Sequence, residues 1–431
     1  MKYRKEMMQI HRMAVPILMN YALASVFEIF DEAIVGHYSV EGFALVGMAA
    51  SILYTITGAL GILSSAFHIL AAELSGRQEY GKLEQTFAAA KLLAAGIGGG
   101  FVLVSLLGGR WFFGNIYTVS GRDLEELLSY FYPASITVLQ NMIWFQYAVY
   151  FRNRYNTKIG VYATGVSIIV NLFFDIVLVY GKAGFPGMGV AGAAWGSVTG
   201  LGCGLLVYQI PYYRVRCART GNIQEPVKRI LWSYPALFGQ ELFESTIFVL
   251  IVQGAAARLG TEQMAVYKLV DIVYGVIGLP VVAYASAAQT CALQSRAVGN
   301  RKETKIYLRV GQCAAFAVTG SLCLLCGVFR EALLGSVVTD RGVTEMAVPF
   351  LYLMFVLTLI RIPYQVFLTY LQGSGWERKV FLYTAVGTVL AGGAVLGASR
   401  RWGLTGIYSV MIGETAILEW IYGKWIRRKA E

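Results

Sequence analysis

Apolar residues run in long, unbroken stretches along this chain instead of alternating with polar ones. Segments such as Gly42–Ala72, Leu127–Tyr150 and Ala183–Tyr213 contain no Asp, Glu, Lys or Arg. A bilayer core about 30 Å thick is crossed by about 20 helical residues, so each stretch is long enough to span it. The pattern predicts an all-α integral membrane protein with twelve transmembrane helices. We place these near residues 13–36, 45–72, 87–109, 127–150, 159–181, 188–211, 230–257, 265–290, 307–329, 346–371, 380–399 and 402–423.

Composition and charge support this interpretation. The chain is 57% hydrophobic and only 14% charged, whereas soluble domains average about 25% charged residues. The net charge of +11 would also suit a nucleic-acid partner. However, the predicted connections on one side of the membrane hold 25 Lys and Arg, against eight on the other. This positive-inside asymmetry predicts that both termini are cytoplasmic, and we expect no nucleic-acid partner.

The chain reads as two halves built on one plan. A polar connection over Tyr212–Ile230 separates an amino-terminal lobe, residues 1–220 with helices 1–6, from a carboxy-terminal lobe, residues 221–431 with helices 7–12. Six spans per half make the repeats parallel, as in many secondary transporters. The matched segments are Gly76–Lys82 with Gly299–Lys305, Arg152–Lys158 with Gln372–Arg378, and Gly189–Gly192 with Gly403–Gly406.

Small residues and prolines indicate how the helices pack. Glycines recur every fourth residue in the sixth predicted span, at Gly192, Gly196, Gly200 and Gly204. This spacing lines one helix face with small residues and predicts a close approach to a neighbouring helix. Prolines at 16, 235 and 280 lie in or near the ends of spans, where they could act as hinges.

Ionisable residues inside the first lobe are the candidate ion site. Glu28 and Asp31 share one side of the first span, and Asn171 and Asp175 lie one turn apart on the fifth. Asp31 and Asp175 each lie six residues below the outer boundary, roughly 9 Å at helical rise. We therefore expect them at one depth, where they would bind a proton or a sodium ion. A structural hydrogen-bond pair between the helices is the alternative.

The second lobe carries different charges. Glu241 and Glu244 lie on the seventh span, with Glu244 near mid-depth. Arg361 on the tenth span could neutralise Glu244 or face an anionic part of a substrate. Lys268 and Asp271 are spaced for an ion pair within the eighth span. Together Glu244, Glu241 and Arg361 form a candidate substrate site or second coupling site.

Aromatic residues cluster on the fourth span and its cytoplasmic end. Such rings could hold flat organic cations by cation–π contact, although interfacial belts and lipid-facing rings are a commoner cause. The residues are Tyr130, Phe131, Tyr132, Trp144, Phe145, Tyr147, Tyr150 and Phe151.

Several stretches together resemble the multidrug and toxic compound extrusion (MATE) family of the MOP flippase superfamily. They are Pro16–Leu18, Asp31–Gly36, Phe43–Gly47, Asn156–Lys158, Asn171–Asp175, Pro186–Ala194 and Ala287–Gln289. The resemblance implies two pseudo-symmetric six-helix lobes around a central cavity. It also implies a secondary antiporter that exports organic, often cationic, amphipathic compounds in exchange for protons or sodium by alternating access.

The resemblance also implies roles for single residues. Asp31, Asn171 and Asp175 match the family's ion- or proton-binding positions in the first lobe, and Glu244 resembles a seventh-span glutamate of some branches. The chain departs from the pattern in lacking an acid near Ile362–Gln365 to partner Glu244, and in having Glu28 as an extra acid.

A flippase of lipid-linked precursors, from the same superfamily, is the alternative function. A flippase would favour a cationic cavity, and only Arg361 and Lys268 support one. An intramembrane enzyme would need a catalytic constellation that we do not recognise here, so we expect no enzymatic activity and no cofactor beyond the coupling ion. We expect a monomer in the plasma (inner) membrane that contacts lipid and a small organic substrate.

Overall fold

The chain packs as two compact units. The computed structural model describes residues 3–182, 184–218, 221–338 and 340–429, apart from the side chains of residues 428 and 429 and of several residues between 26 and 43. Residues Met19–Tyr234 form one unit, here the amino unit, and Met1–Leu18 with Pro235–Glu431 form the other, the carboxy unit. Both changes of unit lie inside helices close to a proline, Pro16 and Pro235. The predicted division at residue 220 stays a prediction.

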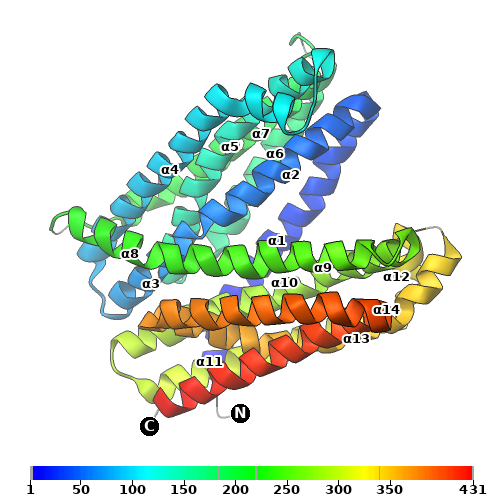
Figure 1. The fold of residues 1–431 in the computed structure, drawn as a ribbon. Helices are drawn as coiled ribbons and strands as arrows, with labels where there is room; N and C mark the ends of the chain where they lie inside the picture. The colour runs from blue at the N-terminus through cyan, green and yellow to red at the C-terminus, as the bar shows by residue number, and fades with distance from the viewer. Residues whose placement is uncertain (1–2, 183, 219–220, 339, 430–431) are drawn as a thin grey trace. The chain divides into compact units, whose positions relative to one another are not determined.

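The amino unit is a bundle of long helices. In Figure 1, α4, α5 and α7 run side by side along it, and α6 lies against α7. Apolar side chains such as Val46, Phe113, Leu127, Val138 and Val190 form its core between α2, α4, α5 and α7. Its helices are most of α1 (Arg4–Tyr38), α2 (Val40–Gly61), α3 (Leu63–Gly76), α4 (Tyr80–Asn115), α5 (Gly121–Asn153), α6 (Lys158–Tyr180), α7 (Val190–Val215) and the first part of α8 (Gln224–Glu241).

The carboxy unit is a second bundle. Its α10 contacts both α11 and α13, and α13 contacts α14, as Figure 1 also shows. Buried residues such as Val266, Val270, Leu351, Leu357 and Ile407 form its core. Its helices are the start of α1, the rest of α8, η1 (Leu242–Ile247), α9 (Phe248–Ala257), α10 (Thr261–Ala297), α11 (Arg301–Val328), α12 (Arg330–Val337), α13 (Arg341–Leu371), η2 (Gln372–Trp376) and α14 (Glu377–Lys429).

Every regular element in the described part of the chain is helical, which confirms the predicted all-α class. α14 bends sharply at Gly403, and α8, η1 and α9 form one continuous helix. With α14 divided there and α2 taken together with α3, the described residues form twelve long helical segments. Eight helices among the described residues are long and apolar enough to cross a membrane, and one of them, Arg341–Arg427, contains three predicted spans.

The backbone repeats itself between the two halves of the sequence. Gly189 has φ 57° and ψ −135°, and Gly403 has φ 58° and ψ −140°. Only glycine adopts this conformation readily, because a Cβ would clash there. Each glycine begins the last long helix of its half. Three residues after each of them, a second glycine lies against the preceding helix.

Two further turns also correspond. Tyr155 and Gly375 have φ values of 57° and 80°, as the sequence match predicts. Gln78 and Gly299 have φ values of 59° and 79°, so here the structural equivalent of Gly299 lies two residues later than the matched Gly76. These shared turns support the internal repeat through backbone geometry in addition to the sequence match.

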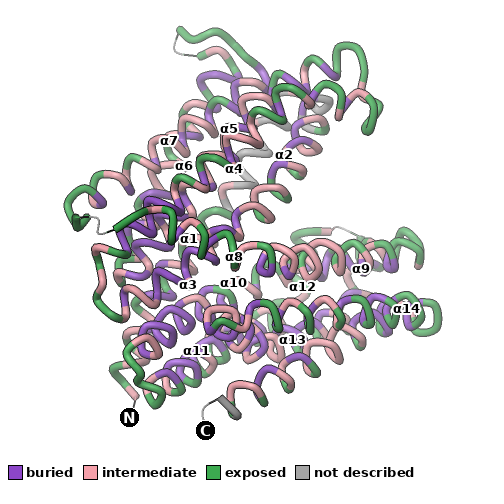
Figure 2. Tube along the Cα trace, turned by 60° about the vertical axis from the view of Figure 1, so that its left-hand side comes forward, coloured by how far each residue is buried: buried purple, intermediate pink, exposed green. Residues whose placement is uncertain are grey.

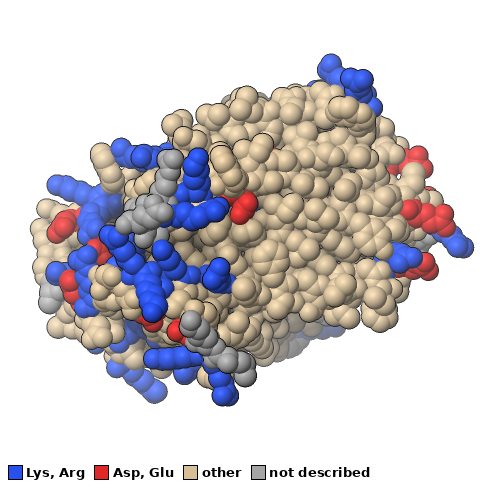
Figure 3. Space-filling view, turned by 90° about the horizontal axis from the view of Figure 1, so that it is seen from below, with Lys and Arg blue, Asp and Glu red and all other residues tan. Residues whose placement is uncertain are grey.

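Large apolar side chains cover much of the surface. Leu107 on α4 is 87% exposed, and Leu324 and Val328 on α11 are each 73% exposed. Figure 2 shows such exposed stretches alternating with buried ones along the helices. A soluble protein rarely exposes patches of this kind, whereas lipid tails solvate them. Figure 3 shows Lys and Arg gathered at one end of the visible face, beyond a broad band without charge.

The glycine stripe of α7 packs against α6, as its spacing predicts. A Cβ at Gly192 would lie 2.6 Å from a backbone carbon of Leu178, and a Cβ at Gly200 would lie 2.6 Å from the carbonyl oxygen of Ser167. These distances are shorter than any ordinary carbon contact. The two backbones can therefore approach this closely only while these positions remain glycine.

We expect Gly200→Ala to destabilise the protein by about 1–3 kcal/mol, the usual cost of overpacking. Gly202→Ala, on the same helix α7, is the matched control, because its Cβ would make an ordinary 3.4 Å contact with the side chain of Gln140 on α5. Both changes gain the same helix propensity, so their difference isolates packing. Thermal unfolding in detergent measures this difference. Equal melting temperatures of the two variants would contradict the close packing of α7 on α6.

Candidate functional site

The first candidate site lies between α6 and α7 in the amino unit. Asp175 is completely buried and Asn171, one turn before it, is 2% exposed. The glycine stripe makes room for them: a Cβ at Gly196 would lie 1.9 Å from Asp175 Oδ1, and a Cβ at Gly200 would lie 2.7 Å from the Cβ of Asn171. The small residues of α7 thus admit an acid and an amide that larger residues would exclude.

Hydrogen bonds hold Asn171 and Asp175 to each other and to α7. With its nitrogen toward Asp175, the Asn171 amide donates to Asp175 Oδ2 at 2.9 Å and accepts from the backbone N–H of Ser197 at 2.7 Å. The Ser197 hydroxyl lies 3.2 Å from the same amide oxygen. This orientation satisfies both ends of the amide. The sequence carried no signal for Ser197, which reaches the site only because α7 packs so closely.

The register of α1 along α6 bears on Asp31. The Thr164 hydroxyl donates to Asn20 Oδ1, and the Tyr180 hydroxyl donates to the carbonyl oxygen of Ile34 at 3.0 Å. Eleven residues separate Asn20 from position 31, and eleven separate Thr164 from Asp175. The backbone of position 31 therefore lies at about the level of Asp175 along the two helices. The side chains of Glu28 and Asp31 themselves lie outside the described part of the structure.

Oxygen donors dominate this site, so it fits a proton or a hard cation. The Asp175 carboxylate, the Asn171 amide and the Ser197 hydroxyl offer oxygens, which suit sodium better than a soft metal. Among the described residues, no three His, Cys, Asp or Glu side chains gather as a metal centre would require. The predicted sodium site at Asp31, Asn171 and Asp175 thus stays a prediction.

The second candidate site is a cavity of about 370 Å³ inside the carboxy unit. Its charged lining comprises three carboxylates, Glu244, Asp271 and Glu414, and one guanidinium, Arg361. Apolar side chains from α9, α10, α13 and α14 form much of the remaining wall. Excess negative charge within an apolar wall suits an amphipathic cation better than an anion.

Arg361 is paired within this cavity. Its Nη2 lies 3.3 Å from Glu244 Oε1, and its Nη1 donates to the Tyr274 hydroxyl. Glu244 itself lies on η1, a π-helical turn. Such turns are frequent at functional sites. Of the two roles that the sequence left open for Arg361, the structure therefore favours neutralising Glu244.

Other predicted residues lie elsewhere. Glu241 is not among the residues that line the cavity, although it belongs to the same helix as Glu244. Among the described residues Lys268 and Asp271 form no ion pair, so that prediction is wrong. The two side chains point in different directions, because Asp271 lines the cavity, whereas Lys268 is exposed.

Part of the aromatic cluster of the fourth span is packed inside the amino unit. Tyr147 and Tyr150 on α5 pack with Phe87 on α4 and Tyr212 on α7 in edge and stacked contacts. Lys91 fills the position that a bound cation would take, with its ammonium 4.5 Å from the centre of Phe87 and 4.7 Å from that of Tyr212. The sequence-based prediction overlooked this lysine.

A buried acid completes that cluster. The hydroxyls of Tyr150 and Tyr212 both donate to Glu84, at 3.0 Å from Tyr212. Glu84 is 1% exposed. Its two tyrosine partners come from helices far apart in the sequence, so only the fold reveals that this acid is satisfied.

Comparison with known proteins gives a consistent result. The family model described as MatE matches residues 16–177 and 235–393. The probable multidrug resistance protein NorM of Thermotoga maritima is 22% identical over 357 residues, which cover 80% of this chain and 74% of that protein. A protein of the same description from Photorhabdus laumondii is 21% identical over 436 residues, covering 95% and 93%.

Solved structures share the fold. A mutant of the Vibrio cholerae MATE transporter VcmN has a TM-score of 0.89 at 14% identity, covering 98% of this chain and 97% of that one. A MOP superfamily transporter from Pyrococcus furiosus has a TM-score of 0.84 at 15% identity, covering 99% and 96%. Reverse polarity of its binding pocket is said to suggest a different function for it. The predicted membrane fold is confirmed by this likeness.

We expect a double-mutant cycle of Glu244→Gln and Arg361→Gln to give a coupling energy of about 0.5–3 kcal/mol, because the pair is mostly shielded from solvent. Arg341 and Glu345 on α13 form an exposed control pair at 3.0 Å, for which about 0.5 kcal/mol or less is expected. Free energies of unfolding in mixed micelles would provide both values. Equal couplings would show that the cavity does not shield the pair.

Proposed function

The chain belongs to the MatE family of membrane transporters, and from that premise we propose that it exports organic cations in exchange for protons or sodium ions. The observation that carries the proposal is the charge of the cavity in the carboxy unit. Among its described lining residues are three carboxylates and one cationic residue, Arg361, which is already paired with Glu244. A monovalent organic cation would find uncompensated negative charge and apolar walls there.

Coupling is assigned to the site in the amino unit. Asp175 is the acid that α6 and α7 enclose, and Asn171 orients it by donating to one carboxylate oxygen. A carboxylate at membrane depth is costly, so it is retained where it binds an ion or a proton. The register of α1 supports Asp31 as its partner at the same level. Antiport by alternating access of the two lobes would link this site to the substrate cavity.

The charge distribution supports an orientation with both termini in the cytoplasm. The sequence places 25 Lys and Arg in the connections of one side and eight in those of the other, and Figure 3 shows Lys and Arg gathered at one end of the visible face. Basic loops remain on the cytoplasmic side during insertion. The plasma (inner) membrane is the location that we infer for this transporter.

The flippase alternative receives less support from the cavity. Binding a pyrophosphate would need free cationic groups, whereas Arg361 is engaged by Glu244 and Tyr274. Transport in proteoliposomes with pH and sodium gradients imposed separately distinguishes the two functions. Efflux that follows either gradient supports the antiporter, and efflux indifferent to both would overturn it in favour of a flippase.

Asp175→Asn is expected to reduce gradient-driven efflux of an organic cation such as ethidium to the passive leak, because a neutral amide cannot bind the coupling ion. The variant should still fold, since asparagine keeps the hydrogen bond with Asn171. Asp123→Asn is the matched control, because Asp123 is an exposed acid in the first turn of α5. Undiminished efflux in the Asp175 variant would sink the coupling role.

Glu244→Gln should weaken binding of a monovalent organic cation by roughly five- to tenfold, because it removes one negative charge and leaves Arg361 uncompensated. Glu345→Gln on α13, with a side chain 69% exposed, should leave affinity unchanged. Equilibrium binding to the purified protein tests both variants. Tighter binding of the cation by the Glu244 variant would place the substrate elsewhere.

A further inference from the structure

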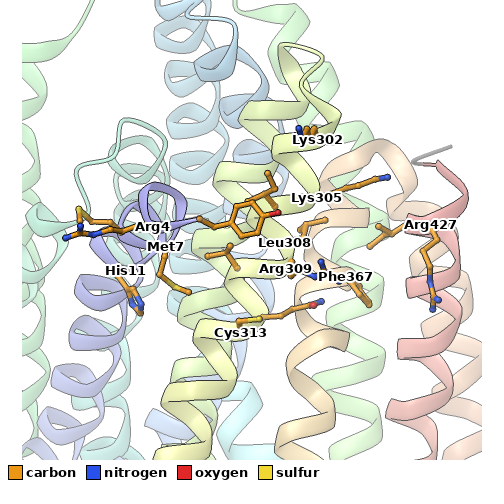
Figure 4. A pocket seen from close by; sticks show the side chains of 16 residues that line it. Arg4, Met7, His11, Lys302, Lys305, Leu308, Arg309, Cys313, Phe367 and Arg427 are labelled. Carbon is orange, nitrogen blue, oxygen red and sulfur yellow. The ribbon is translucent and has the colours of Figure 1, made fainter. Parts of the chain in front are cut away.

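A second, larger pocket lies in the carboxy unit, away from the acidic cavity. Its volume is about 1050 Å³. The floor is the first half of α11, with the start of α1 on one side and the ends of α13 and α14 on the other. Figure 4 shows Arg4, Met7 and His11 on one side of α11, with Phe367 and Arg427 on the opposite side. None of the residues that line this groove lines the acidic cavity.

The polarity of the groove is opposite to that of the acidic cavity. Its described lining residues include five basic side chains, Arg4, Lys302, Lys305, Arg309 and Arg427, and no carboxylate. Within the described part of the chain, no acid lies within ion-pair distance of Arg4, Lys302 or Arg309. An anion bound there would meet the positive charges of Arg4, Lys302 and Arg309, which no described acid pairs, whereas an organic cation would be repelled.

The basic residues follow one face of α11. Lys302, Lys305 and Arg309 are separated by three and four residues, which aligns them along one stripe. Gln312 continues the stripe about 15 Å from Lys302 at helical rise. Its Nε2 is a buried donor with no hydrogen-bond partner among the described residues. A buried amide nitrogen without a partner is costly, and an ester or phosphate oxygen of a ligand would satisfy it.

Apolar side chains make up the rest of the groove. Met7, Met8, Ile306, Val310 and Phe367 line it beside the basic stripe. Met8 is 59% exposed. Inorganic phosphate or a polyphosphate would gain nothing from these side chains. A molecule with an anionic head and hydrocarbon tails would use both surfaces.

We propose that this groove binds one anionic phospholipid of the cytoplasmic leaflet. Its phosphate lies among Lys302, Lys305 and Arg309, its ester region accepts from Gln312, and its acyl chains run past Phe367. The lipid would tie the start of α1 to α11 within the carboxy unit. The proposal is independent of the transport function, because none of these residues lines the acidic cavity.

Native cysteines provide a local readout. Cys313 lines the groove and is exposed, and Cys217, exposed in the amino unit, lies outside it. The full chain in mild detergent is alkylated with a maleimide, and mass spectrometry follows each cysteine-containing peptide. Saturating dioctanoyl phosphatidylglycerol should slow the alkylation of Cys313 by at least about tenfold and that of Cys217 by less than about twofold.

Two further ligands separate the sources of the anion. Dioctanoyl phosphatidylcholine and inorganic phosphate, at matched concentrations, should each leave the alkylation rate of Cys313 within about twofold of its value without ligand. Equal protection by phosphate would mean a free-anion site, and equal protection by phosphatidylcholine would mean a groove without charge selection. Either result overturns the proposal.

The triple variant Lys302→Gln, Lys305→Gln and Arg309→Gln should raise the half-protecting concentration of phosphatidylglycerol by at least about tenfold. An unchanged concentration would overturn the proposal. If this variant does not fold, Gln312→Leu replaces it and should weaken protection several-fold, and an unchanged value there is equally decisive.

A matched control removes the same charge elsewhere. The triple variant Lys158→Gln, Arg214→Gln and Lys228→Gln changes three exposed residues of the amino unit. In this control variant, phosphatidylglycerol should protect Cys313 from alkylation as well as it does in the unmodified protein. An equal loss of protection in this control would show that net charge, and not the groove, attracts the lipid.

Discussion

A carboxylate buried at membrane depth must find its hydrogen bonds inside the protein, and the packing of α6 on α7 depends on that constraint. Asp175 has no exposed surface. Glycines at 196 and 200 bring the α7 backbone close enough for the Ser197 N–H to meet the Asn171 amide, which in turn donates to the acid. In hydrocarbon an unsatisfied polar group costs several kcal/mol. The polar pair therefore depends on the close helix approach that the glycine stripe permits. The close packing and the Asn171–Asp175 pair therefore cannot be varied separately here.

The carboxy unit solves the same problem differently. It collects three acids around one cavity and places a single arginine among them. The arginine neutralises Glu244 directly and reaches Tyr274 with its other arm. The remaining negative charge faces the cavity, where a bound cation would compensate it. The two units thus share backbone turns at Gly189 and Gly403 but not their chemistry.

Surfaces of different polarity provide three kinds of contact in this protein. The acidic cavity of the carboxy unit suits a cation, and the basic groove over α11 suits an anionic head group. Elsewhere the exposed helix surface is apolar and suits lipid tails, as at Leu324 and Val328 at the end of α11. The aromatic cluster of the amino unit adds a fourth arrangement, in which Lys91 of the chain itself occupies the cation position. Aromatic composition alone therefore does not indicate a binding pocket.

Local pattern determined much of this protein from the sequence by itself. Uninterrupted apolar stretches predicted the helices, since their length follows from bilayer thickness. Glycine at every fourth residue predicted the close helix pair. The spacing of Asn171 and Asp175 by one helical turn predicted one candidate site. Partners that lie far apart in the sequence were decided only by the tertiary structure. Ser197 joins Asn171, Tyr274 joins Arg361, and Asp271 turns from Lys268 toward a cavity because helix packing sets side-chain direction, which periodicity along one helix does not encode.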